Sequence, residues 1–185
     1  MKRDKGTPMT ASYNTTPGIP FPTRWRSSLL KLLTAVTLLI GATSVSASEG
    51  KQLSQAEALL DSLHQSAAEA NWNRYFSLYL PDAIFIGTDA TEHWTMSEFE
   101  GYARPTDGWE YTLRERTLVP LTTLNGDKVL VFDELLDSAS YGVSRGTGTL
   151  LLTSSGWKIA QYHLSFPIPN EIAKEITARI KAAKK

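Results

Sequence analysis

The sequence of 185 residues contains no cysteine. The protein therefore has no disulfide, no thiol nucleophile and no zinc site built on cysteine thiolates. A lipoprotein anchor, which is attached to a cysteine, is excluded for the same reason. The stability of the folded protein must then come from the packing of its core.

An apolar run long enough to cross a membrane is also missing. Leu32 to Ala42 is apolar, but a spanning helix needs about 20 such residues. The run follows a basic segment and precedes Val45-Ser46-Ala47, a cleavage site of small residues. This order is typical of a secretory signal peptide. We therefore expect residues 1–47 to be removed and the protein to be periplasmic or secreted, in preference to a membrane-anchored form.

The sequence has no excess of positive charge. It contains 19 basic and 19 acidic residues, and the leader holds six of the basic ones and one of the acidic ones, which leaves 13 and 18. An acidic domain without basic clusters is a poor partner for nucleic acid or an anionic membrane. No nucleophile elbow or glycine-rich phosphate loop is present. The sequence predicts no cofactor and no metal site.

Hydrophobic spacing predicts three helices in the first half of the mature chain. Ser54 to Glu57 fits a capping box at the start of the first, and its apolar stripe includes Leu60 and Leu63. His64 on this helix is more typical of a surface or core-edge histidine than of a ligand. A short helix follows Asn71, carries Tyr79 on its buried side and is expected to end at Pro81. A second capping box, residues 95–98, opens a third helix.

The second half reads as β-structure. Residues 128–136 have apolar side chains on both faces, which predicts a central strand. Residues 147–153 and 157–166 form a predicted hairpin around a turn at 154–156. A last helix follows Asn170. Its isoleucine stripe (Ile172, Ile176, Ile180) should dock on its own domain or on a second subunit, because so narrow a stripe cannot stabilise an isolated helix.

This order of elements predicts an α+β fold, in which a strongly curved antiparallel or mixed sheet wraps around the N-terminal helices. The segments WNRYFSLYLPDAIFIGTDATEHW (72–94) and RGTG…GWKIAQYHLSFPIPN (145–170) resemble the SnoaL-like branch of the NTF2-like superfamily. The resemblance implies a cone that encloses a pocket over residues 48–170, followed by an extra C-terminal helix at 171–185, and often a homodimer formed through the sheet. Characterised members include cyclases, isomerases, dehydratases and non-enzymatic binding domains, so the fold alone does not give the activity.

Alternation along the last strand points to a site. Trp157, Ile159, Gln161, His163 and Ser165 share one face if the strand is regular. This face turns from apolar to polar, which favours a pocket with a few polar groups. His163 and Asp133 are the predicted acid/base pair. Strand geometry sends Asp133 and Glu134 to opposite faces, and Asp133 is the favoured one for the pocket. The other expected lining residues are Trp94, Tyr111, Glu134, Tyr141, Gln161 and Ser165.

Two functions follow from this site. The first is the binding of a small, largely apolar molecule in the cone. The alternative is a cofactor-free isomerase, cyclase or dehydratase that uses His163 and a strand carboxylate for proton transfer. The expected partners are a small-molecule ligand and a second copy of the chain.

Overall fold

The computed structural model describes residues 30–183, and the side chains of residues 48–183. Residues 1–29 of the predicted leader lie outside the described residues, so the signal peptide stays a prediction. Residues from Val45 onward form one compact unit. Within the described part of the chain, no helix has the length and apolar character needed to span a membrane.

The first helix, α1 (Leu30–Ala68), runs without a break through Ser54. The Ser54 hydroxyl donates to the carbonyl of Gly50 one turn earlier, at 3.1 Å. The prediction of a helix start at Ser54 is therefore wrong, because the serine bonds back into a continuing helix. The predicted apolar stripe is confirmed: Leu60 and Leu63 are buried in the core.

Helix α2 (Trp72–Ser77) begins after Asn71, whose side-chain oxygen accepts from the backbone N–H of Arg74. The prediction that Tyr79 belongs to this helix is wrong, because Tyr79 starts strand β1 (Tyr79–Ile86). Pro81 lies in this strand, where its pairing with β6 (Gly156–Ser165) shifts register. Proline, which has no N–H to donate, is tolerated where the ladder is already interrupted.

Strand β2 (His93–Thr95) leads into helix α3 (Met96–Ala103). The predicted capping box is confirmed here. The backbone N–H of Glu98 is bonded to the Thr95 hydroxyl, and the Glu98 carboxylate accepts from the backbone N–H of Thr95. Two free donors of the helix start are satisfied in this way.

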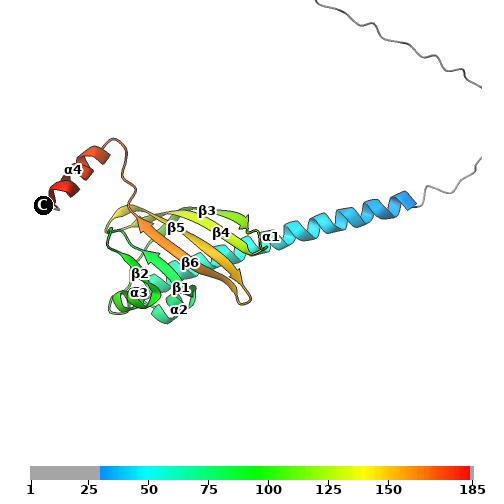
Figure 1. The fold of residues 1–185 in the computed structure, drawn as a ribbon, viewed down its shortest axis with the longest axis horizontal. Coiled ribbons are helices and arrows are strands. Elements are labelled where there is room, and N and C mark those ends of the chain that lie inside the picture. The colour runs from blue at the N-terminus through cyan, green and yellow to red at the C-terminus, as the bar shows by residue number, and fades with distance from the viewer. Residues whose placement is uncertain (1–29, 184–185) are drawn as a thin grey trace, which may run out of the picture. The chain divides into compact units, whose positions relative to one another are not determined.

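Six strands form one curved, unclosed sheet in the order β2-β1-β6-β5-β4-β3 (Figure 1). The remaining strands are β3 (Thr112–Thr122), β4 (Lys128–Ser138) and β5 (Gly142–Thr153). β1 and β6 are parallel and all other neighbours are antiparallel. The predicted α+β class, the interior position of β4 and the β5–β6 hairpin are confirmed.

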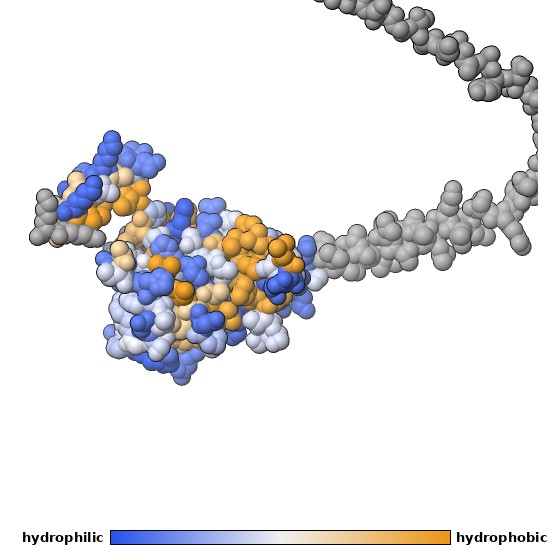
Figure 2. All heavy atoms as spheres, viewed as in Figure 1, coloured by the Kyte–Doolittle hydropathy of each residue, from blue (hydrophilic) through white to orange (hydrophobic). Residues whose placement is uncertain are grey.

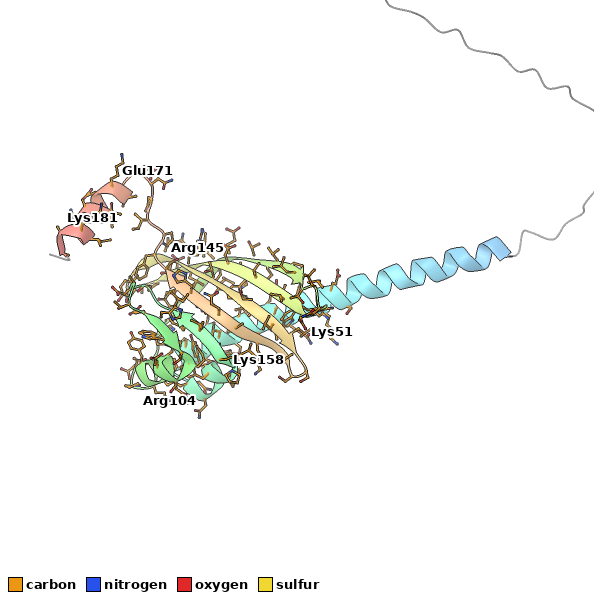
Figure 3. The ribbon with its side chains drawn as sticks, viewed as in Figure 1. Lys51, Arg104, Arg145, Lys158, Glu171 and Lys181 are labelled. Carbon is orange, nitrogen blue, oxygen red and sulfur yellow. The ribbon has the colours of Figure 1, made fainter. Side chains whose placement is uncertain are left out.

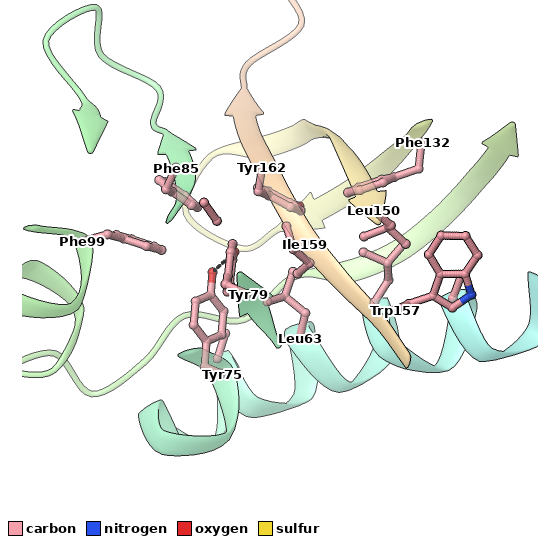
Figure 4. Close-up of a cluster of buried hydrophobic side chains, with 14 of the residues drawn as sticks. Leu63, Tyr75, Tyr79, Phe85, Phe99, Phe132, Leu150, Trp157, Ile159 and Tyr162 are labelled. Atoms are coloured by element: carbon pink, nitrogen blue, oxygen red, sulfur yellow. Dashed lines mark hydrogen bonds between the residues drawn. The ribbon is translucent and has the colours of Figure 1, made fainter. Parts of the chain in front are cut away.

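The core lies between α1, α2 and α3 and the face of the sheet that they cover, which we call the covered face. Figure 4 shows Leu63 of α1 and Tyr75 of α2 beside Ile159 and Tyr162 of β6. Trp157 and Ile159 are buried, as alternation predicted. The Trp157 indole N–H donates to the carbonyl of Gln52 at 2.9 Å, which ties β6 to α1.

The opposite, open face of the sheet is not covered by any described element. The last helix, α4 (Ala173–Ala183), has no buried residue, and Ile172 and Ile180 are 45% and 46% exposed. The expectation that its isoleucines pack on their own domain is therefore wrong for this structure. Docking on a second subunit stays a prediction.

Candidate functional site

A buried carboxylate stands at the centre of the covered face. Glu134 of β4 is fully buried, and three side chains bond to it. His64 Nε2 lies 2.7 Å from its Oε1, the Tyr162 hydroxyl donates to the same oxygen at 2.8 Å, and Arg116 Nε donates to Oε2 at 2.9 Å. We call these four residues the Glu134 network.

Burial raises the pKa of Glu134, but the hydrogen bonds and positive charges of His64 and Arg116 outweigh it, so the pKa lies below its ordinary value. The carboxylate is therefore ionised at neutral pH. Arg116 also donates to Asp61 at 2.7 Å, which connects the network to the surface. Burial raises the pKa of Tyr162 and the Glu134 charge raises it further, so this phenol stays protonated and can donate.

Local sequence explains how these groups meet. In β4, Leu130, Phe132, Glu134 and Leu136 alternate onto the covered face and are all buried. Glu134 pairs with Arg116 across β3 and with Gly146 across β5. A side chain at Gly146 would overlap the Tyr162 hydroxyl, so glycine makes room for the phenol to reach the carboxylate.

Two cavities open beside this network. The small cavity, of about 20 Å³, is lined in part by His64, Tyr75 and Tyr162, and it has room for about one water molecule. The larger of the two, which we call the main cavity, measures about 250 Å³. Both are lined by Phe85, Trp109, Tyr111 and Leu164, so they are neighbours. His64 therefore lines a small cavity that adjoins the aromatic main cavity.

The predicted pair His163 and Asp133 does not face this pocket. In β6 the partners of Leu150 and Thr149 are Ile159 and Gln161, so Ala160 is an extra residue, a bulge. The bulge reverses the alternation, and Tyr162 takes the buried position that a regular strand would give to His163. The prediction that His163 faces the cavity is wrong for this reason, since His163 lines neither of the two cavities.

Asp133 was also placed on the wrong face. Glu134, not Asp133, alternates inward with Phe132 and Leu136. Asp133 pairs with Thr147, and Thr147 pairs with His163, so the predicted pair lies along one row of the open face. Gln161 and Ser165 share this face with His163 and do not line either cavity.

The remaining predicted residues line the main cavity or lie on the covered face. Trp94, Tyr111 and Tyr141 line the main cavity. Glu134 lies on the covered face but lines neither cavity, and it is bonded to His64 and Tyr162, which line the small one. The sequence interpretation missed His64, Arg116 and Tyr162. Two signals were available: His64 follows Leu60 by one turn, and Arg116 and Glu134 are each nine residues from Asn125, so a hairpin centred on Asn125 pairs them.

The Glu134 network includes a buried polar atom that has no hydrogen-bond partner among the described residues. Among the described residues, Arg116 Nη2 and Ser144 Oγ are buried and make no hydrogen bond. In that same part of the chain, no three side chains of histidine, aspartate or glutamate converge in a metal-binding cluster. The chemistry offered by the described residues is that of an imidazole held by a buried carboxylate beside an aromatic pocket.

Known structures share this fold. A protein of unknown function from Pectobacterium atrosepticum is 15% identical and superposes with a TM-score of 0.53 over 64% of this chain and 92% of its own. A cystatin-like fold protein from Burkholderia xenovorans is 16% identical, with a TM-score of 0.53 over 64% and 95%. A candidate dehydratase of the NTF2-like family from Streptomyces avermitilis is 12% identical, with a TM-score of 0.53 over 65% and 99%.

At such low identity these similarities establish the fold and no activity. No curated protein matches the sequence. A family model described as a SnoaL-like domain matches residues 56–169, which hold α1 from Ala56 onward, all six strands and both cavities. The chain belongs to the SnoaL-like domain family of NTF2-like folds.

Proposed function

We propose that this protein is an exported SnoaL-like domain that binds a small, largely apolar molecule in its main cavity. The observation that carries the proposal is the lining: eight of the twelve residues around the cavity are aromatic. A pocket of this composition buries apolar ligand surface efficiently, and its few polar groups fix the orientation of the ligand.

The size of the cavity limits the ligand. The cavity volume of about 250 Å³ corresponds to about eight water molecules, since one molecule occupies ~30 Å³ in liquid water. The ligand is therefore of the order of one substituted ring. Tyr102 and Tyr141 line the cavity yet are 54% and 68% exposed. Exposed aromatic side chains at a cavity wall provide an apolar entrance from solvent.

The test is a calorimetric titration with tert-butylbenzene. Leu164→Trp fills the space shared by the two cavities, because Leu164 lines both. Leu135→Trp adds the same bulk on the open face of β4 and serves as the matched control. We expect Leu164→Trp to weaken binding at least about tenfold, because the indole occupies space in which the ligand would otherwise bury apolar surface. Equal binding by both variants would refute the cavity as the site.

A second candidate function is acid/base catalysis, and the His64–Glu134 contact favours it. A carboxylate that holds one ring nitrogen fixes the tautomer of a histidine and leaves the other nitrogen to exchange protons. His64 lines the small cavity next to the main one. A substrate in the pocket would then present an acidic C–H or a hydroxyl to the imidazole.

Deuterium exchange tests this second function without a known substrate. Small enolisable aryl ketones are incubated with the protein in heavy water, and loss of the α-proton signal is followed by NMR. Catalysis by the wild type that is lost in His64→Ala and kept in His163→Ala supports the enzyme. Exchange that is equal in the three proteins, or absent throughout this panel, leaves ligand binding as the proposed function.

We also propose export and self-association. The basic leader and the small-residue site at Val45-Ser46-Ala47 support processing before Ser48, and N-terminal sequencing of envelope protein tests it. A homodimer through the open face is supported by the exposed apolar surface over β3, β4 and β5 (Figure 2), where Val119 and Leu121 are 44% and 49% exposed. Val131→Lys should then dissociate the dimer in light-scattering measurements.

A further inference from the structure

The main cavity is lined by an acidic side chain and by no basic one among the described residues. Among the described residues that line it, Glu92 is the only ionisable side chain other than phenols, and none is lysine, arginine or histidine. The basic residues Arg104 at the C-cap of α3, Arg145 of β5 and Lys158 of β6 do not line this cavity (Figure 3). A ligand in this cavity therefore meets many aromatic rings and one negative charge.

Glu92 is held in place by its own loop. The backbone N–H of Gly87 donates to the carbonyl of Glu92 at 2.8 Å, and the N–H of Asp89 donates to its Oε2 at 3.1 Å. A side chain at Gly87 would overlap the Glu92 carboxylate, so the glycine lets the carboxylate lie against the cavity wall. Its Oε1 makes no hydrogen bond to the described residues and is available to a ligand.

The rings come from two separate groups. Trp94 lies 4.8 Å from Tyr102 and 5.6 Å from Phe99, between ring centroids, on the β2–α3 side. Tyr141, directly before β5, stacks on Phe166, directly after β6, with 4.9 Å between ring centroids. Both groups line the same cavity. A ligand between them is therefore approached by aromatic groups from distant parts of the sequence.

The Tyr111 phenol at the wall of the main cavity stays protonated at neutral pH. Burial raises the pKa of Tyr111, and repulsion by Tyr141 and Tyr102 raises it further. Aromatic faces carry negative potential and attract organic cations, most strongly when the cation is desolvated between several rings. A carboxylate at the same wall adds a direct Coulomb attraction.

We propose that the ligand is an organic cation, a methylated or tertiary ammonium group carried on a small apolar body, with the ammonium beside Glu92 and Trp94. This inference rests on the proposed binding function and specifies its ligand class. A neutral hydrocarbon would contact the rings but leave the charge of Glu92 uncompensated, and an anion would be repelled by it. A cation on an apolar body interacts favourably with both the aromatic lining and the carboxylate.

The test compares phenyltrimethylammonium with its neutral isostere tert-butylbenzene by calorimetry on the full chain. Glu92→Gln keeps the size and the acceptor for Asp89 but removes the charge. Glu115→Gln, an exposed acid on β3 away from both cavities, is the matched control. We expect Glu92→Gln to weaken binding of the cation about tenfold and to leave the neutral isostere within about twofold.

Trp94→Leu provides a second variant, and it should weaken the cation more than the isostere because a Leu side chain has no π-face. Binding of tert-butylbenzene by each variant shows that its cavity is intact. If the neutral isostere binds and the cation does not, or if Glu92→Gln behaves like Glu115→Gln, the cation inference is wrong and the binding function stands. If neither compound binds the wild type, both proposals fail.

Discussion

The two faces of the sheet differ in how they surround polar side chains: those on the covered face are buried, and those on the open face are not. Glu134 and Tyr162 are buried on the covered face and bonded to each other, whereas their neighbours in sequence, Asp133 and His163, lie on the open face. Residue type alone does not distinguish the members of each pair. The two members of each pair differ by one position along the strand, and in β6 a bulge determines which of Tyr162 and His163 is buried.

The largest expected effect comes from removing the buried charge. Glu134→Ala leaves the Arg116 guanidinium and His64 without their partner in a buried site, which should lower the free energy of unfolding by ~3–5 kcal/mol. Asp133→Ala, one residue away on the open face, should change it by no more than about 0.5 kcal/mol. Urea unfolding measures both. If both variants lost a similar amount of unfolding free energy, the proposed difference between the two faces would be wrong.

A smaller effect is expected at Gly146. An added methyl group overlaps the Tyr162 hydroxyl, so Gly146→Ala should cost about 1–3 kcal/mol of unfolding free energy through overpacking. Removing the hydroxyl with Tyr162→Phe should restore part of this loss, which a double-mutant cycle would show.

The matched control for Gly146→Ala is Gly101→Ala. Gly101 lies in α3, and an added methyl group there meets no atom within 4 Å. Alanine favours a helix over glycine, so this variant should gain up to ~1 kcal/mol. A loss at Gly101 as large as that at Gly146 would show that the close approach to Tyr162 is not the cause.

Much of this fold was predictable from local patterns. The Thr95–Glu98 capping box, the turn at Gly126 and the apolar alternation of β4 each depend on residues close in sequence. The error at Ser54 arose because the same residues fit a helix start and a helix interior. The site was less predictable, because a bulge depends on pairing with another strand and leaves no local signal at Ala160.

The partners of Glu134 also come from distant segments. His64 is 70 residues away in sequence and Arg116 is 18 residues away, across a hairpin. Only the hairpin register could have been extrapolated from the sequence, by counting outward from the turn. The contact with α1 follows from how the helix packs on the sheet, which a single sequence does not specify.

The smallest effect should appear in the dependence of stability on pH. The pKa of Glu134 is depressed in the folded protein, so its ionised form stabilises the fold above the ordinary carboxyl pKa. This contribution is lost as the pH falls through the folded value. Glu134→Gln should therefore show a smaller loss of melting temperature on acidification than the wild type does. Equal acid sensitivity would mean that the carboxylate is not held ionised by His64 and Arg116.

The most direct test of the account is a two-dimensional NMR titration of isotope-labelled protein with phenyltrimethylammonium and with tert-butylbenzene. If the covered face holds the site, amide signals of Gly87, Trp94, Tyr111 and Leu164 should shift with the bound compound, while those of Asp133, Thr147 and His163 stay unchanged. Shifts confined to Asp133, Thr147 and His163 would place the ligand on the open face and contradict the account.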